Sequence, residues 1–316
     1  MNNRIQQQSN KISVLILIQI SLAASFLISG NEVLAQNVLL KGESRAYIAP
    51  EISPDGRYVA ITSKGYTGLW TIRTDGFSLR QFSSVRGAGY IKRWSPDSKW
   101  ILYRENNGGR QELKIGEVFT RNVSSISIRV KKFEDVRWID NDKLYLRSNG
   151  NISYMRSGVI VQNSKKNRTV IYTDSEKIYL ESLEKKNVDI IDPVLGVQYL
   201  DAVLSPDGSK VAFQIVGGNL QVYELNNFQL HDLGVGSSPR WSPNGKKIVY
   251  QLTTDDGHRV ISSNLYLINF DGTGKLQLTD TQNVHEMRPS FYPKGNRIIY
   301  DTDLLGEIRT MIVPVK

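Results

Sequence analysis

Cysteine is absent from this chain of 316 residues, and histidine occurs only three times. A chain without cysteine has no disulfide framework, no thiolate zinc site and no cysteine nucleophile. It also cannot be a lipoprotein anchored through an N-terminal cysteine. If it is exported, its stability depends on its hydrophobic core, which a chain of roughly 300 residues can supply.

Sequence signatures of two large hydrolase classes are also missing. The chain contains neither a G-x-S-x-G sequence nor an H-E-x-x-H sequence. A serine hydrolase of the α/β type and a zinc protease of the helical type are therefore not expected. The histidines are His231, His258 and His285, and no two of them stand at the spacing of metal ligands.

The N-terminus has the layout of a secretory signal peptide. Arg4 and Lys11 precede an apolar run over residues 12–28, and small residues lead to Ala35. We predict a signal peptide over residues 1–35 and a mature domain over 36–316. The alternative is an uncleaved anchor helix, because about 17 apolar residues is near the lower limit for spanning a membrane.

The chain is basic, with a formal net charge of +9 that lies almost entirely after residue 35. A charge of this size favours anionic surfaces or partners, although a basic solvated surface without a partner is equally consistent with it.

A short turn motif of the Ser-Pro-Asp-Gly type recurs along the chain. Proline presets the backbone at the second position, Asp or Asn bonds to its own backbone, and glycine accepts a positive φ. An apolar residue precedes each copy and a β-rich run follows it, which indicates two strands joined by the turn. The copies begin at Ser53, Ser95, Ile139, Ser205, Ser242 and Tyr292.

This repeat predicts an all-β protein, a six-bladed β-propeller with four-stranded blades. Intervals of about 40 to 50 residues are typical of propeller blades. The last blade ends after its third strand, "RTMIVPV", so residues 37–43 ("NVLLKGE") are expected to supply its fourth strand and close the ring.

One interval, from Ile139 to Ser205, is longer than the others. We interpret residues 149–174 as an extra hairpin that protrudes from blade three. The alternative is a degenerate seventh blade, which is disfavoured here because no Pro-Asp-Gly turn opens it.

The turns and their flanks resemble the propeller repeat of the TolB family. The match is closest over residues 285–315, "HEMRPSFYPKGNRIIYDTDLLGEIRTMIVPV", and extends from about Ala49 to the end. The resemblance implies a six-bladed propeller in the periplasm, or secreted, that binds a protein or peptide without catalysis. It covers the propeller alone, because too few residues precede Ala49 for the N-terminal α/β domain of TolB.

Arginine occupies a repeated position two residues before the turn motif, at Arg93, Arg137 and Arg240. Equivalent positions on innermost strands lie at similar height around a propeller axis, so we expect a partial ring of guanidinium groups, with Glu51 at the same position and Arg288 nearby. Such a ring suits carboxylates, and thus an acidic peptide. Alternatively, each arginine pairs with a local acid, of which Glu51, Glu134 and Asp135 are candidates.

Weaker candidates for chemistry lie in loops. His285 and Glu286, in the loop that enters the last blade, are a candidate catalytic or metal pair; the alternative is a loop histidine with an exposed neighbour. Asp301 and Asp303, with Glu307, are weak candidates for a calcium site, as are Asp255 and Asp256 before His258; ordinary solvated turns are favoured for all of them. A basic cluster in the long interval could contact an anionic membrane or wall polymer, or could simply be solvated: Arg156, Lys165, Lys166 and Arg168.

The sequence therefore predicts an exported, monomeric binding or scaffold protein of the cell envelope that recognises a protein or peptide on the funnel face of the propeller. A peptidoglycan-associated lipoprotein is one such partner. No cofactor, no nucleic acid partner and no membrane span after processing are expected. The second hypothesis is a propeller lyase or hydrolase that acts on an acidic saccharide or another small ligand through His285 and Glu286.

Overall fold

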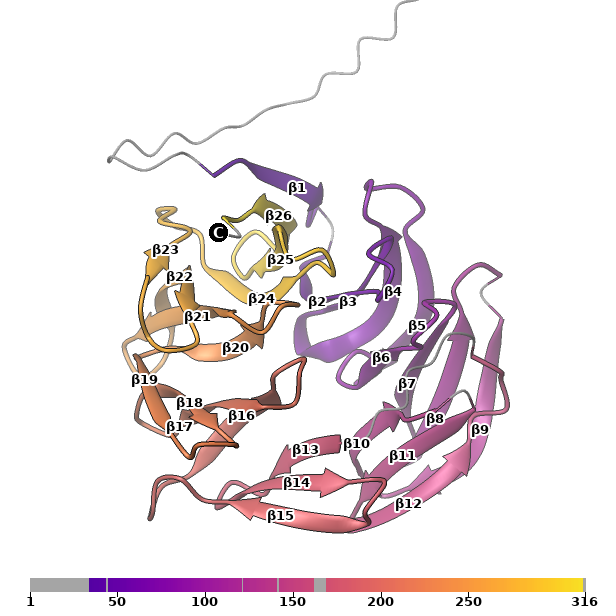
Figure 1. Cartoon of the computed structure of the whole chain (residues 1–316). Helices are drawn as coiled ribbons and strands as arrows, with labels where there is room; N and C mark the ends of the chain where they lie inside the picture. The colour runs from indigo at the N-terminus through magenta and orange to yellow at the C-terminus, as the bar shows by residue number, and fades with distance from the viewer. Residues whose placement is uncertain (1–33, 44, 121, 141, 162–168, 315–316) are drawn as a thin grey trace, which may run out of the picture.

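The computed structural model describes residues 34–43, 45–120, 122–140, 142–161 and 169–314. These residues form seven antiparallel sheets, arranged as the blades of a ring around a central axis (Figure 1). The chain is thus an all-β propeller. Within each blade the strands follow one another from the axis outwards, and the innermost strand is named first below.

The first three blades follow the N-terminal strand. Blade 1 contains β2 (Tyr47–Ile52), β3 (Tyr58–Ser63), the short 3₁₀ helix η1 (Lys64–Tyr66), β4 (Thr67–Arg73) and β5 (Arg80–Arg86). Blade 2 contains β6 (Lys92–Trp94), β7 (Trp100–Asn107), β8 (Arg110–Glu117) and β9 (Val123–Val130). Blade 3 contains β10 (Phe133–Trp138), β11 (Lys143–Ser148) and β12 (Asn151–Arg156).

The remaining four blades complete the ring. Blade 4 contains β13 (Thr169–Thr173), β14 (Ile178–Ser182) and β15 (Asn187–Ile191). Blade 5 contains β16 (Tyr199–Leu204), β17 (Lys210–Ile215), β18 (Leu220–Glu224) and β19 (Leu230–Gly234). Blade 6 contains β20 (Ser237–Trp241), β21 (Lys247–Asp255), β22 (Val260–Asn269) and β23 (Leu276–Gln277), and blade 7 contains β24 (Glu286–Phe291), β25 (Arg297–Thr302), β26 (Ile308–Ile312) and β1 (Gln36–Leu40).

The prediction of six four-stranded blades is wrong, because the long interval holds two blades rather than one with a protruding hairpin. The supposed insert, residues 149–174, supplies β12 to blade 3 and β13 to blade 4. The turn from β13 to β14 reverses the chain without proline or glycine: the Asp174 carboxylate accepts the N–H groups of Glu176 and Lys177, and Ser175 takes a φ of 83°. A search for Pro-Asp-Gly turns therefore misses this blade.

The repeated turn owes its sequence to a small network of local hydrogen bonds. In blade 1 the Ser53 hydroxyl donates to Asp55 (2.6 Å) and accepts the N–H of Tyr58 (2.9 Å), while Asp55 accepts the N–H of Arg57 (3.0 Å). The same serine-to-acceptor bond recurs in three further blades, as Ser95–Asp97, Ser205–Asp207 and Ser242–Asn244. The motif therefore reports a strand reversal and not a ligand site.

The ring is closed by the N-terminal strand, as the sequence indicated. Strand β1 pairs antiparallel with β26, with Gln36 opposite Met311 and Leu40 opposite Ile308. Leu39 and Leu40 pack on the core between blades 7 and 1. This pairing joins the first and last parts of the described chain and covers the outer edge of β26 (Figure 1).

The hydrophobic core lies between adjacent blades, and one seam differs from the others. Six apolar clusters fill the seams between neighbouring blades other than 3 and 4. Between blades 3 and 4, the buried Glu181 accepts hydroxyl hydrogen bonds from Tyr145 (3.1 Å) and Tyr154 (3.0 Å), and Arg147 lies 3.9 Å over the ring of Tyr172. Polar and aromatic contacts thus hold this seam among the described residues.

Candidate functional site

A cavity of about 720 Å³ opens between the innermost strands of the ring. The innermost strands β2, β6, β10, β16, β20 and β24 line it, together with Tyr66, Tyr90 and two turn prolines. Among the lining side chains are five cations and two carboxylates. They are Lys92, Arg93, Arg137, Arg240 and Arg288, with Glu51 and Asp201.

Repeated β-bulges shape the wall of this axial cavity. Ala49, Asp201, Ser238 and Arg288 each adopt a φ between 51° and 55°, and each coincides with a register shift on an innermost strand. A bulge turns side chains out of the regular alternation of a strand and leaves an N–H group unpaired in the ladder. Side chains accept two of these groups: Asp301 accepts the N–H of Ala49 at 3.2 Å, and Gln251 accepts that of Arg288 at 2.7 Å.

Three of the five cations form ion pairs with two neighbouring acids. Arg93 and Arg137 share Asp135, at 3.4 and 2.5 Å, and Arg137 also donates to the carbonyl of Ile171. Arg288 forms a bidentate pair with the fully buried Asp301. These three side chains therefore fasten the wall of the cavity.

The other two cations, Lys92 and Arg240, form no ion pair within the described part of the chain. Lys92 is 6% exposed, and its ammonium group donates to the carbonyl of Gly89 at 3.4 Å. Burial lowers the pKa of Lys92, and the field of Glu51 offsets this only in part. Arg240 donates to the carbonyl of Pro239 at 2.8 Å and is exposed to the cavity.

The structure places all five residues nominated for binding, Arg93, Arg137, Arg240, Glu51 and Arg288, in the cavity wall. Their part in binding stays a prediction. The local-pairing alternative describes Arg93 and Arg137, whereas Arg240 has no acidic partner in the described chain.

His285 and Glu286 are not in an exposed loop, as the sequence had suggested, and do not line the cavity. Glu286 begins β24 and is fully buried, and His285 is 7% exposed with its Nε2 3.0 Å from the carbonyl oxygen of Ile261. Neither carboxylate oxygen of Glu286 has a hydrogen-bond partner. Burial raises the pKa of Glu286 to about 7, opposed in part by Thr281, Arg309 and Thr279.

The acidic candidates for a metal are each held by other partners. Asp301 lies in β25 rather than in a loop and is held by Arg288, while Asp303 pairs with Lys64 at 3.5 Å. Glu307 pairs with Arg309 at 2.7 Å. Asp255 and Asp256 cap the N–H groups of their own turn, which includes His258. No group of three or more possible metal ligands occurs among the residues that the structure describes.

The basic cluster can be described only in part. Arg156 pairs with Asp142 at 2.7 Å, while Lys165, Lys166 and Arg168 lie outside the described residues. Most of the predicted signal peptide, residues 1–33, is also outside them.

Sequence reasoning missed Lys92 and Asp201. Lys92 stands immediately before Arg93, at a repeat position where three other copies have proline: Pro50, Pro239 and Pro289. A charged residue in place of proline on an innermost strand was the available signal. Asp201 occupies the repeat position of the bulge residue, two places before Val203, and no local pattern announces that bulge.

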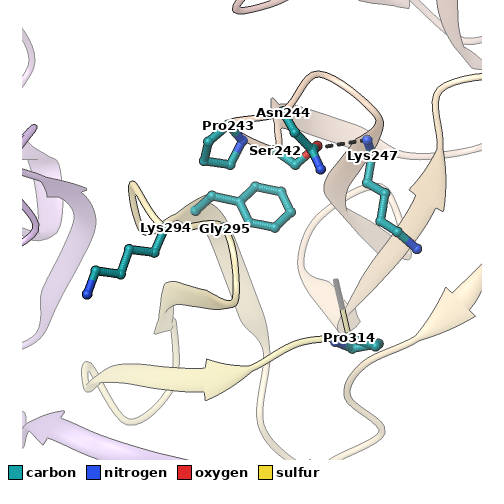
Figure 2. Close-up of a pocket in the computed structure, with 8 residues that line it drawn as sticks. Ser242, Pro243, Asn244, Lys247, Lys294, Gly295 and Pro314 are labelled. Atoms are coloured by element: carbon teal, nitrogen blue, oxygen red, sulfur yellow. Dashed lines mark hydrogen bonds between the residues drawn. The ribbon is translucent and has the colours of Figure 1, made fainter. Parts of the chain in front are cut away.

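A second, smaller pocket of about 250 Å³ lies between the turns of blades 6 and 7 (Figure 2). Pro243, Phe291 and Pro314 form much of its wall, and Lys247 and Lys294 extend to opposite sides in this view. It lacks the convergent charges of the axial cavity, which is therefore the candidate site.

The fold and this cavity define a seven-bladed β-propeller with a cationic centre. More specifically, the chain is similar in sequence to TolB proteins. It is 22% identical over 278 residues to the Tol-Pal system protein TolB of Francisella tularensis subsp. mediasiatica, which confirms the resemblance inferred from the turns. The match covers 82% of this chain and 57% of that protein, so the chain spans little more than half the length of the TolB proteins that it matches. No family model matches the chain.

Proteins of different kinds share this fold among solved structures. An oligogalacturonate lyase in complex with manganese superposes with a TM-score of 0.61 at 13% identity, covering 89% of this chain and 97% of that one. The β-propeller domain of Cps50 (Swd1) from Myceliophthora thermophila gives 0.58 at 10% identity, covering 88% of this chain and all of that one. At such identities the likeness establishes the fold alone. Within the described residues, no helix is long and apolar enough to cross a membrane.

Proposed function

We propose that the chain is a non-enzymatic binding protein of the cell envelope, which takes an acidic segment of a protein or peptide partner into the axial cavity. The observation that carries this proposal is the excess of positive charge in the cavity. Five cations and two carboxylates line it; three of the cations pair with Asp135 or Asp301, and the other two, Lys92 and Arg240, have no acidic partner in the described chain.

The physical basis is the cost of keeping like charges together at a partly desolvated site. Arg240 and the buried Lys92 face the same cavity as three further cations, so an incoming carboxylate gains charge-assisted hydrogen bonds without displacing an existing ion pair. Field lines concentrate in a concave site whose walls carry one sign of charge, which also speeds the encounter with an acidic partner.

The place of action follows from two further expectations. The predicted leader over residues 1–35 directs export, and relatedness to TolB supports the periplasm and an envelope partner. The partner we expect is an envelope protein such as a peptidoglycan-associated lipoprotein, and we expect a monomer. The lyase or hydrolase alternative is not favoured, because its nominated residues, His285 and Glu286, lie outside the cavity lining.

The test is affinity capture from an envelope extract with the full chain, tagged at its C-terminus and expressed with its own N-terminal segment. Retained proteins are identified by mass spectrometry after washes at low and high salt. We expect an envelope protein to be retained, to be released by a blocked hexaglutamate peptide, and to be lost when Arg93, Arg137 and Arg240 are changed to glutamine.

The matched control changes Lys246, Lys247 and Lys294 to glutamine, which removes the same charge from the turns of blades 6 and 7. This control should retain the partner. Equal losses from both variants would mean that net charge alone drives retention. If the purified chain contains a stoichiometric divalent metal and retains no envelope protein, the lyase alternative replaces this proposal.

A further inference from the structure

The two unpaired cations of the axial cavity come from separate blades. Lys92 belongs to β6 of blade 2, and Arg240 belongs to β20 of blade 6. Both side chains line the axial cavity, and the positive charge of Arg240 contributes to the lowered pKa of Lys92. The ring therefore brings together two positive charges that lie far apart in the sequence.

Lys92 has donors that the described residues leave unused. An ammonium group has three N–H bonds, and the contact with the Gly89 carbonyl at 3.4 Å employs one of them. A cation that is more than nine-tenths buried without an ion pair is unusual, because desolvation costs several kcal/mol unless a partner compensates. Its place in the wall means that such a partner can come from the cavity.

Arg240 supplies a fork of donors at the same site. Its Nη1 donates to the carbonyl of Pro239, the preceding residue on the same strand, and no carboxylate of the described chain lies within ion-pair distance. By contrast, Arg93 and Arg137 are bound to Asp135, and Arg288 is bound to Asp301. A ligand carboxylate that approached those three would have to compete with an acid already in place.

We propose that Lys92 and Arg240 together form the subsite that binds one carboxylate of the acidic partner, while Arg93, Arg137 and Arg288 are structural. This inference rests on the proposed function and specifies where its partner is recognised. An acidic peptide is the ligand to which we commit, since a peptide can place one side-chain carboxylate in the cavity while its backbone stays in solvent.

Binding at this subsite is coupled to proton uptake. The charged groups that act on Lys92 are Glu51 on β2, Arg93 on β6, Asp301 on β25 and Arg240 on β20. A bound carboxylate adds a negative charge to this set and favours the protonated amine. The affinity should therefore decrease as the pH rises, and the decrease should disappear when Lys92 is replaced.

The experiment measures the affinity of blocked hexaglutamate by calorimetry for the full chain and for Lys92→Met, Arg240→Gln and the double variant. Each single change should weaken binding by about tenfold or more, because a hydrogen-bonded charge is lost. Since both side chains hold the same carboxylate, the two effects should not be additive. Lys294→Gln, in the turn outside the cavity, is the control for net charge and should change the affinity by less than about twofold.

Two further readouts separate the subsite from a structural effect. Lys92→Met removes a buried charge, so its melting temperature should equal or exceed that of the wild type. Calorimetry over a series of pH values up to 10.5, each in two buffers of different ionisation enthalpy, should show proton uptake by the wild type as the pH passes the lowered pKa of Lys92, and none by Lys92→Met. The subsite proposal would be overturned if Lys92→Met and Arg240→Gln each changed the affinity for hexaglutamate no more than Lys294→Gln does, with additive effects in the double variant.

The outcomes also distinguish this inference from the proposed function. If the wild type retains an envelope protein and both single variants retain it equally, the subsite is wrong and the proposed function stands. If hexaglutamate binds through the pair but no envelope protein is retained, the subsite stands and the proposed function fails. Tighter binding of trigalacturonate than of the peptide, through the same pair, would overturn the choice of an acidic peptide.

Discussion

The sharpest prediction concerns Glu286, a carboxyl group that is fully buried between blades 6 and 7. Both of its oxygens lack a hydrogen-bond partner, and burial raises its pKa to about 7 from an ordinary value of 4.5. The folded protein therefore binds a proton that the unfolded chain releases between those two pH values. The contribution of Glu286 is most favourable below about pH 4.5 and is lost as the pH rises to about 7.

The magnitude follows from the interval between 4.5 and about 7, at about 1.4 kcal/mol for each pH unit. Ionisation of Glu286 should cost about 3 kcal/mol of unfolding free energy at neutral pH, a large share of the 5 to 15 kcal/mol typical of a domain. Glu286→Gln has nearly the same shape and cannot ionise. Relative to the wild type, it should gain about 3 kcal/mol between about pH 4 and pH 8.

The assay is urea unfolding followed by tryptophan fluorescence, with the difference between variant and wild type compared across pH. Glu224→Gln is the control of opposite sign, because the hydrogen bond from His231 lowers the pKa of Glu224. That substitution should become more harmful as the pH rises through the lowered pKa of Glu224 towards the ordinary value of 4.5, and its effect should stay constant above that value. If the difference between Glu286→Gln and the wild type does not change with pH, Glu286 ionises normally and the argument from burial is refuted.

Three other changes test the construction of the ring. Deletion of residues 36–40 removes β1 and the packing of Leu39 and Leu40, and should lower the unfolding free energy by about 3 kcal/mol or more. The control Val38→Ser, at an exposed site of the same strand, should be nearly neutral. An unchanged melting temperature after the deletion would contradict closure of the ring by β1. Trp241→Phe should lower the unfolding free energy by about 1 kcal/mol more than Trp138→Phe does. The reason is that the indole N–H of Trp241 donates to the Val203 carbonyl at 3.1 Å, whereas that of Trp138 has no partner among the described residues. Equal losses of unfolding free energy, measured with denaturant, would refute this reasoning. Glu181→Ala should destabilise the seam between blades 3 and 4 by about 2 kcal/mol, because it leaves the buried Tyr145 hydroxyl without a hydrogen-bond partner. Amide hydrogen exchange in β11 and β14 should therefore become faster, and unchanged exchange rates there would contradict the prediction.

The propeller class could be predicted because the repeated turn is a local structure. Its hydrogen bonds join residues two to five positions apart, such as Ser53 with Asp55 and Tyr58. The sequence within the turn therefore carries most of the information that the turn needs. The missing fourth strand of the last blade likewise predicted the pairing of β1 with β26.

The number of blades could not be read in the same way. The turn of blade 4 relies on the side chain of Asp174 and a positive φ at Ser175, which leaves no Pro-Asp-Gly signature. Whether such a segment becomes a hairpin or a blade depends on what packs beside it. Here Glu181 and Tyr172 meet side chains of blade 3 across the seam.

The candidate site also combines features that the sequence predicts with features that only the tertiary structure determines. Repetition placed Arg93, Arg137 and Arg240 on innermost strands, and they line the cavity as its geometry requires. The ion pair of Arg137 with Asp135 is local, two residues apart, but the same Asp135 also binds Arg93 across 42 residues, and Arg240 has no acidic partner in the described chain. The turn motif can be predicted from the sequence because its hydrogen bonds join residues that are close in the chain. The lack of an acidic partner for Lys92 and Arg240 among the described residues and the burial of Glu286 are determined only when strands distant in sequence come together around one axis.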